Sequence, residues 1–172
     1  MNSADIPGIL NVPTPKWMRL ERSTVDRPFD HLGVYVIRIA SGKPVGRLKG
    51  QSDVIYIGSG QIETRVKAHS RPRFNFKDKG SLLAWIAADV SIGELEVAFF
   101  PCQKHKEVES DLLFGYLQDH REPPPANLKL ELNEKQKVAL CLSVETKRDV
   151  TTEQIDGLLR ELDDLSRSRN PS

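Results

Sequence analysis

One glutamate, Glu109, lies on the apolar side of the longest helical pattern in the sequence, which runs from about Lys104 to Arg121. An α-helix turns by roughly 100° per residue, which puts Glu109 in the middle of a broad apolar face. The apolar residues on this face are Val108, Leu112, Leu113, Tyr116 and Leu117. A carboxylate on a buried face is unfavourable unless it is paired, hydrogen-bonded or bound to a metal ion. Glu109 is therefore the partner of a buried arginine, part of a helix-end interaction, or a metal-binding carboxylate that faces a cleft.

Arg65 and His69 form a second group with chemical potential. They lie one helical turn apart in a segment, 61–70, that is predicted to be helical, so their side chains share one face. Two adjacent cationic side chains repel each other, which indicates an anion or a carboxylate between them. The alternative is ordinary solvated helix surface.

Basic residues are concentrated in one part of the chain, although the formal net charge of the 172 residues is only +1. Between Arg38 and Lys79 there are ten lysines and arginines and three acidic residues, whereas from Glu107 onward nine basic residues accompany fourteen acidic ones. Phosphate contacts provide most non-specific affinity for nucleic acid, so this block favours a polyanionic partner. Plain solvated surface is the alternative. The residues predicted to contact nucleic acid are Lys43, Arg47, Lys49, Lys67, Arg71, Arg73 and Lys77.

The elements that must position these residues follow from the hydrophobic pattern. Runs rich in β-branched and aromatic residues predict strands at 33–40, 53–58 and 95–100. A loop rich in Gly and Lys (41–52) joins the first two, which we expect to be antiparallel neighbours. Side chains alternate along a strand, so Tyr35 and Tyr56 can project from the same face of the sheet. With helices at 61–70, from 81 and at 104–121, the pattern predicts an α/β (α+β) sandwich. Its helices flank a small, mainly antiparallel three-stranded sheet.

The ends of the chain are predicted to be appendages. Residues 1–30 contain scattered prolines and apolar residues, which is typical of an arm that packs onto a domain. The main domain is expected to span 31–130. Residues 131–172 are expected to form a strand-helix (β-α) extension packed on the same domain, with a strand at 138–144 and a charged helix that opens with the capping-box sequence of 151–154.

Composition restricts the class of protein. The chain is 38% hydrophobic and 28% charged, which is typical of a soluble globular protein. It has neither an apolar stretch long enough to span a bilayer nor a signal sequence, so we expect no membrane partner and a cytoplasmic location. Cys102 and Cys141 are expected to be free thiols in a reducing compartment.

Two tripeptides on the first two predicted strands complete a known pattern. They are Gly33-Val34-Tyr35 and Tyr56-Ile57-Gly58. In chain order they are followed by Arg65 and His69, by Glu109, and by Asn127 directly after Pro125-Ala126. Over about residues 33–128 this order resembles the GIY-YIG nuclease superfamily, with valine in place of the usual isoleucine in the first tripeptide. The longer, basic linker between the tripeptides departs from the most compact members.

The resemblance implies a metal-dependent endonuclease that hydrolyses phosphodiester bonds. Glu109 would hold one divalent ion, Mg²⁺ or Mn²⁺, and Arg65 would meet the negative charge of the transition state. Tyr35 would position or deprotonate the attacking water, with His69 or the local cationic field favouring its phenolate, and Tyr35, Tyr56 and His69 all stay candidates for the general base. Tyr56 would donate a hydrogen bond within the site, and Asn127 would order either its own loop or the Glu109 carboxylate. The implied catalytic residues are Tyr35, Tyr56, Arg65, His69, Glu109 and Asn127.

The nuclease is expected to act on nucleic acid, DNA rather than RNA. Two alternatives to a nuclease stay open at this point. The first is a catalytically inactive nucleic-acid-binding module on the same fold. The second is a protein-interaction domain. In that case the charged C-terminal helix, 151–167, would form a homodimer or bind a partner protein.

Overall fold

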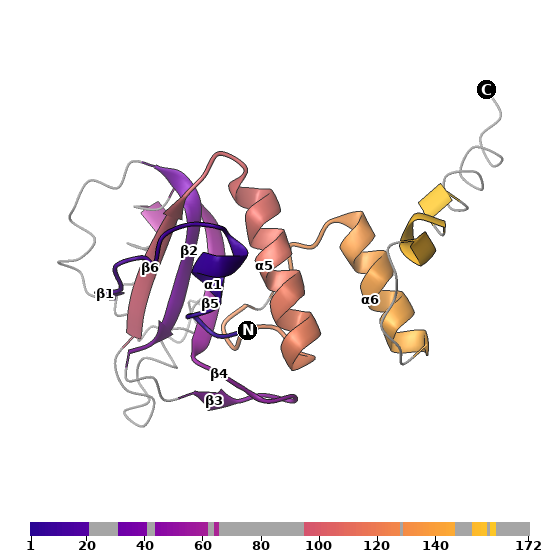
Figure 1. Cartoon of the computed structure of the whole chain (residues 1–172), viewed down its shortest axis with the longest axis horizontal. Coiled ribbons are helices and arrows are strands. Elements are labelled where there is room, and N and C mark those ends of the chain that lie inside the picture. The colour runs from indigo at the N-terminus through magenta and orange to yellow at the C-terminus, as the bar shows by residue number, and fades with distance from the viewer. Residues whose placement is uncertain are drawn as a thin grey trace, which may run out of the picture. The chain divides into compact units, whose positions relative to one another are not determined.

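The computed structural model describes residues 1–20, 31–40, 44–61, 64–65, 95–127, 129–146, 153–157 and 159–160. The chain forms two compact units, Met1–Glu131 and Leu132–Ser172, both drawn in Figure 1. The residues of the predicted site that the structure describes all belong to the first unit.

The first unit is built on an antiparallel sheet with the strand order β1-β6-β2-β5. Strands β2 (Leu32–Ile39), β5 (Val54–Gln61) and β6 (Leu95–Pro101) correspond to the three predicted runs. The mixed α+β class is confirmed. The sheet has four strands rather than three, because β1 (Met18–Arg19) from the N-terminal arm pairs with β6.

Helix α5 (His105–His120) packs against β2 and β5, and Figure 1 shows it running alongside these strands. Its side chains Leu112, Leu113 and Tyr116 are completely buried. Burying one such leucine stabilises the fold by about 1.5–3 kcal/mol, so this interface makes a major contribution to stability. The helix ends at Arg121, whose left-handed backbone (φ 63°) lets its N–H bond the carbonyl of Leu117.

The basic linker between β2 and β5 contains a hairpin formed by β3 (Val45–Gly46) and β4 (Gln51–Ser52). The tip of the hairpin is tied to the end of α5. Lys49 N–H donates to the carbonyl of His120 at 3.1 Å, and the Lys49 carbonyl lies 2.9 Å from His120 Nδ1. These paired contacts fix the tip to the end of the helix.

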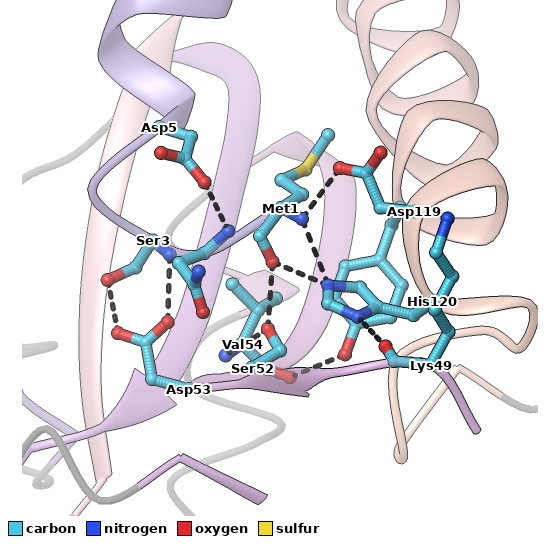
Figure 2. Close-up of polar contacts among 11 residues, drawn as sticks. Met1, Ser3, Asp5, Lys49, Ser52, Asp53, Val54, Asp119 and His120 are labelled. Atoms are coloured by element: carbon cyan, nitrogen blue, oxygen red, sulfur yellow. Dashed lines mark hydrogen bonds and ion pairs between the residues drawn. The ribbon is translucent and has the colours of Figure 1, made fainter. Parts of the chain in front are cut away.

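The N-terminal segment, which includes α1 (Ile6–Ile9), is fastened to the same side of the sheet as α5. Figure 2 shows Ser3 donating through its N–H (2.8 Å) and its hydroxyl to the Asp53 carboxylate. The Met1 carbonyl accepts from the Ser52 hydroxyl at 3.0 Å and lies 2.8 Å from His120 Nε2. Polar bonds therefore join this arm to β4, to the start of β5 and to α5.

Arg38 supports the arm from the sheet. Its guanidinium binds Glu96 on the neighbouring strand at 2.8 Å and donates to the Ser3 hydroxyl at 3.1 Å. It also lies 3.9 Å from the ring centre of Trp17, a cation–π contact with the arm.

The predicted C-terminal strand at 138–144 is wrong, because these residues belong to helix α6 (Glu134–Thr146). Asn133 and Gln136 cap its start reciprocally, with each side-chain oxygen accepting from the other residue's N–H at 3.0 Å. Most of this stretch is Glu, Lys, Gln, Ala and Leu, which favour helix, and only two β-branched valines suggest a strand. Residues 153–157 and 159–160 are also helical, so the described secondary structure of the extension is helix.

Two further boundaries differ from the sequence prediction. Strand β5 continues to Gln61, beyond the expected end at Gly58, and helical structure is described only at Thr64 and Arg65. The rest of the predicted helix at 61–70, the helix from 81 and the cap at 151–152 lie outside the described residues. In the described part of the chain, no helix has the length and hydrophobicity needed to cross a membrane.

Candidate active site

Tyr35 and Tyr56 lie side by side on one face of the sheet. Tyr35 is opposite Gly58 in the β2–β5 register, and Tyr56 is opposite Ile37, so both side chains project the same way. The two rings are stacked with centroids 5.8 Å apart and planes at 29°. Their hydroxyl groups are hydrogen-bonded to each other. The two tyrosines therefore lie on the same face of the sheet, as the alternation of side chains along each strand allows.

Gly58 lies beneath this tyrosine pair and leaves it the space it needs. A Cβ atom at Gly58 would lie 2.5 Å from Cε1 of Tyr56 and 2.7 Å from the hydroxyl oxygen of Tyr35. Contacts that short do not occur in folded proteins, so any side chain here would displace both rings. The glycine of the second tripeptide is therefore required by the two tyrosines.

Arg65 lies against the next glycine on the same strand. Gly60 adopts a backbone conformation with φ +124°, which L-residues rarely tolerate, and a Cβ there would lie 3.5 Å from Nε of Arg65. Burial raises the pKa of Tyr35, of Tyr56 and of the Glu109 carboxyl, and the positive charge of Arg65 opposes that rise in all three. Arg65 thus acts electrostatically on all three groups.

Glu109 is half-buried and bound to the sheet through Ser59, whose hydroxyl donates to its Oε2 at 2.6 Å. Burial raises the pKa of the carboxyl, and the Ser59 hydrogen bond and the charges of Arg65 and His105 oppose that rise. The negative charge of Glu109 in turn raises the pKa of both tyrosines. The glutamate found by helical geometry is therefore electrostatically coupled to both tripeptides.

Ser59 was missed by the sequence analysis, and His105, which helical periodicity puts on the same face as Glu109, was not assigned to the site because a lone histidine there is more often a core residue. His105 Nδ1 lies 3.1 Å from the Ser59 hydroxyl, so one serine contacts both His105 and Glu109. The available signal for His105 was its position one turn before Glu109 on the same helix. Ser59 follows the second tripeptide directly, but nothing in the sequence pairs it with α5.

The two tyrosines have different environments. Burial, followed by the influence of Tyr56, raises the pKa of Tyr35 far above its ordinary value. Burial also raises the pKa of Tyr56, but the hydrogen bond from Tyr35 lowers it. Tyr35 is the more deeply buried of the two, so ionisation is less unfavourable at Tyr56.

Asn127 orders its own loop against β5. Its Oδ1 accepts from Ile57 N–H at 3.0 Å and its Nδ2 donates to the Ile57 carbonyl at 2.7 Å. The side chain is buried, and these two bonds give both its amide oxygen and its amide nitrogen a partner. Of the two expected roles, the contacts match ordering of the loop rather than of the Glu109 carboxylate.

The predicted basic contacts divide into different groups. Arg47 is not displayed for a partner, because its side chain is only 8% exposed, lies 3.1 Å from Glu122 and donates to the Pro123 carbonyl at 2.5 Å. The described contacts of Arg47 are thus with groups of the chain itself. Lys49 is exposed at the tip of the β3–β4 hairpin. The remaining predicted contacts, Lys43, Lys67, Arg71, Arg73 and Lys77, lie outside the described residues, as does His69.

The residues present fit a hard divalent cation. Within the described ranges, no group of three or more His, Cys, Asp or Glu side chains is placed to hold a metal ion. Mg²⁺ does not need such a group, because it keeps several waters and binds proteins through one or two carboxylates plus substrate phosphates. The Glu109 carboxylate, fixed at one oxygen by Ser59, meets that requirement.

Comparison of the chain with protein-family models, with curated proteins and with solved structures gave no match.

Proposed function

We propose that the chain is a metal-dependent endonuclease of the GIY-YIG type that hydrolyses phosphodiester bonds in nucleic acid, DNA rather than RNA. The observation that carries the proposal is that one stretch of β5, 56–60, contacts all of these groups: Tyr35 stacks on Tyr56 above Gly58, Arg65 lies beside Gly60, and Ser59 binds Glu109. Phosphodiester hydrolysis needs an activated water, a cation facing the phosphoryl oxygens and an anchor for a divalent ion. In this proposal a tyrosine would activate the water, Arg65 would face the phosphoryl oxygens, and Glu109 would anchor the ion.

The Glu109 carboxylate would hold the divalent ion, Mg²⁺ or Mn²⁺, and Ser59 would fix its orientation. When bound, the ion would supply Lewis-acid stabilisation of the charge that develops on the phosphoryl oxygens. The raised pKa of the carboxyl means that protons compete with the cation at higher pH than they would at an ordinary glutamate.

Tyr56 is the tyrosine better suited to accept a proton from water. It is the less buried of the two, and a hydrogen bond from Tyr35 would stabilise its oxygen when charged. Tyr35 would hold that oxygen in place as a protonated donor. Arg65 would stabilise a Tyr56 phenolate and the transition-state charge with the same guanidinium. His69 is retained as a further candidate base.

The test is cleavage of supercoiled plasmid DNA by the full chain with Mg²⁺ or Mn²⁺, with single-stranded DNA and RNA as parallel substrates. Glu109→Gln and Tyr35→Phe should each reduce the rate by about 100-fold or more, since several kcal/mol of transition-state stabilisation are lost. Matched controls are Glu107→Gln, an exposed acid on the same helix, and Tyr116→Phe, a buried tyrosine whose hydroxyl contacts the Val54 carbonyl. Both controls should cleave at the wild-type rate.

The same assay separates the alternatives. Binding of DNA without cleavage by the wild-type chain would support the inactive nucleic-acid-binding module. If the wild-type chain neither binds nor cleaves any substrate, the nuclease proposal is refuted. The protein-interaction domain is then the alternative that stands.

A further inference from the structure

Three side chains from two elements form a continuous polar chain at the candidate site. Ser59 of β5 lies in the middle, with Glu109 Oε2 2.6 Å and His105 Nδ1 3.1 Å from its hydroxyl oxygen. His105 and Glu109 are one turn apart on α5, so both reach Ser59 from the same side of the helix. All three are partly buried.

The direction of these hydrogen bonds follows from the number of protons. A serine hydroxyl has one proton, and an ionised carboxylate can only accept. Ser59 therefore gives its proton to Glu109, and the contact with His105 requires the histidine to donate. The proton of a neutral His105 ring must then be on Nδ1, because a ring nitrogen's hydrogen bond determines which tautomer is present.

We propose that His105 is a positioning residue for Glu109, acting through Ser59 to fix the carboxylate that holds the divalent ion. This inference rests on the proposed function for the role of Glu109. The Nδ1–H of His105 occupies the serine oxygen and directs its proton to Oε2. Groups that orient a ligand in this way typically change metal affinity by about 10–100-fold.

Two different roles for the cluster fit its geometry less well. In a hydrolase triad the histidine lies between the serine and the carboxylate, whereas here the serine is the central member. A histidine that only fills core space would be buried, but His105 lies at the first residue of α5 and is partly exposed. Its polar contact is with the Ser59 hydroxyl rather than with a backbone group.

The first experiment measures the tautomer of His105 in the full chain without metal or nucleic acid, by nitrogen-15 NMR of the histidine rings. The proposal expects the proton of the neutral ring on Nδ1 in the wild type and loss of that preference in Ser59→Ala. A proton on Nε2 in the wild type would overturn the proposal, whether or not the protein is a nuclease.

The second experiment measures Mn²⁺ affinity of the full chain without nucleic acid, by electron paramagnetic resonance of the free ion. His105→Ala and Ser59→Ala should each weaken binding by about 10-fold or more. His105→Asn should stay within about 3-fold of the wild type, because the asparagine N–H replaces Nδ1–H in the same place. The double variant His105→Ala with Ser59→Ala should be no weaker than either single variant, as expected for residues acting in one chain.

The outcomes distinguish this proposal from the proposed function. Wild-type affinity in His105→Ala, with binding lost in Glu109→Gln, would overturn the role of His105 and leave the metal site intact. An equal loss of Mn²⁺ affinity in His105→Asn and His105→Ala would also overturn the role of His105. The side-chain N–H donor would then not be the cause of the effect. Glu107→Gln, which removes an exposed charge from the same helical turn, should bind like the wild type. Mn²⁺ binding that does not depend on Glu109 would refute the proposed metal site itself.

Discussion

The side-chain amide of Asn127 bonds both backbone groups of Ile57, accepting from its N–H at 3.0 Å and donating to its carbonyl at 2.7 Å. Ala126 N–H donates to the Ile55 carbonyl at 3.0 Å, so the turn before Asn127 follows β5 for two positions. Ile57 itself belongs to the second tripeptide and is completely buried. This loop therefore supports the strand that presents Tyr56.

Asn127→Ala is expected to lower the free energy of unfolding by about 2–4 kcal/mol, because a buried N–H and a buried carbonyl of Ile57 lose their partners. Asn127→Asp keeps an acceptor for the N–H but has no donor for the carbonyl when ionised, so its loss should be intermediate. Urea denaturation of the three proteins provides the measurement. Equal stability of Asn127→Ala and the wild type would contradict this role.

Gly58→Ala is expected to displace both tyrosine rings, because the new Cβ would lie 2.5 Å from Cε1 of Tyr56. Inserting a methyl group into a packed site typically costs about 1–3 kcal/mol of stability, and the nuclease activity should be lost as well. Gly46→Ala is the matched control, since a Cβ there would meet no atom within 4 Å. The control should match the wild type in both thermal melting and plasmid cleavage. Normal cleavage by Gly58→Ala would refute the requirement for glycine at this position.

Glu109 should make stability depend on pH in a defined direction. Burial raises the pKa of its carboxyl above the ordinary value of 4.5, so the folded protein holds this proton more tightly than the unfolded chain does. The contribution of Glu109 to the free energy of unfolding therefore falls as pH rises from the ordinary pKa through the raised one. It is constant at higher pH.

Glu109→Gln removes this titration. Urea denaturation of wild type and variant between about pH 4 and pH 8 should show the wild type losing stability relative to the variant as pH rises. Cleavage should increase over the same range, because the carboxylate must be ionised to bind a cation. Parallel stability curves at every pH would show that the environment of Glu109 does not raise its pKa.

Lys49 and Arg47 should respond differently to mutation. Lys49→Ala removes an exposed charge, so we expect weaker DNA binding and a dependence of log affinity on log salt that is shallower by about one unit. Arg47→Ala should instead lower stability by about 1–3 kcal/mol, because its buried guanidinium supports Glu122 and the Pro123 carbonyl. Fluorescence anisotropy at several salt concentrations, together with urea denaturation, separates the two effects. An unchanged salt dependence in Lys49→Ala would remove the hairpin tip from the proposed interface.

A chain that ends at Glu131 tests the role of the second unit. The first unit has its own buried core and contains the described residues of the candidate site. We therefore expect the shortened protein to fold and to cleave DNA at a rate close to that of the full chain. Size-exclusion chromatography with light scattering should give the same number of subunits for both chains. A dimer that becomes a monomer on truncation would instead support an interaction role for the C-terminal helices.

Much of the central sheet could be predicted from the sequence. Residues 33–40, 53–58 and 95–100 are β-branched and apolar enough to specify strands without help from distant parts of the chain. Period-two alternation was sufficient to allow Tyr35 and Tyr56 on one face, and helical periodicity was sufficient to select Glu109. These are short-range properties, and the pattern of residues determines them directly.

What could not be predicted depends on contacts between distant segments. Ser59 meets His105 and Glu109 across 46 and 50 positions of sequence, so no local pattern marks it. Arg47 looked like any other basic residue of its loop until the fold placed it beside Glu122. The error at 138–144 has a different origin, because a short apolar run fits a strand and a helix equally well and the Asn133 cap was overlooked.

The bonds that join residues 126–127 to β5 also bear on self-association. β5 is last in the strand order, and a strand in that position usually offers a row of free N–H and C=O groups on which another chain can add a strand. The Ala126 and Asn127 bonds occupy that row at Ile55 and Ile57, within the most apolar part of the strand. The loop that supports Tyr56 thus also covers part of this edge, and we expect variants that release it to aggregate before they unfold.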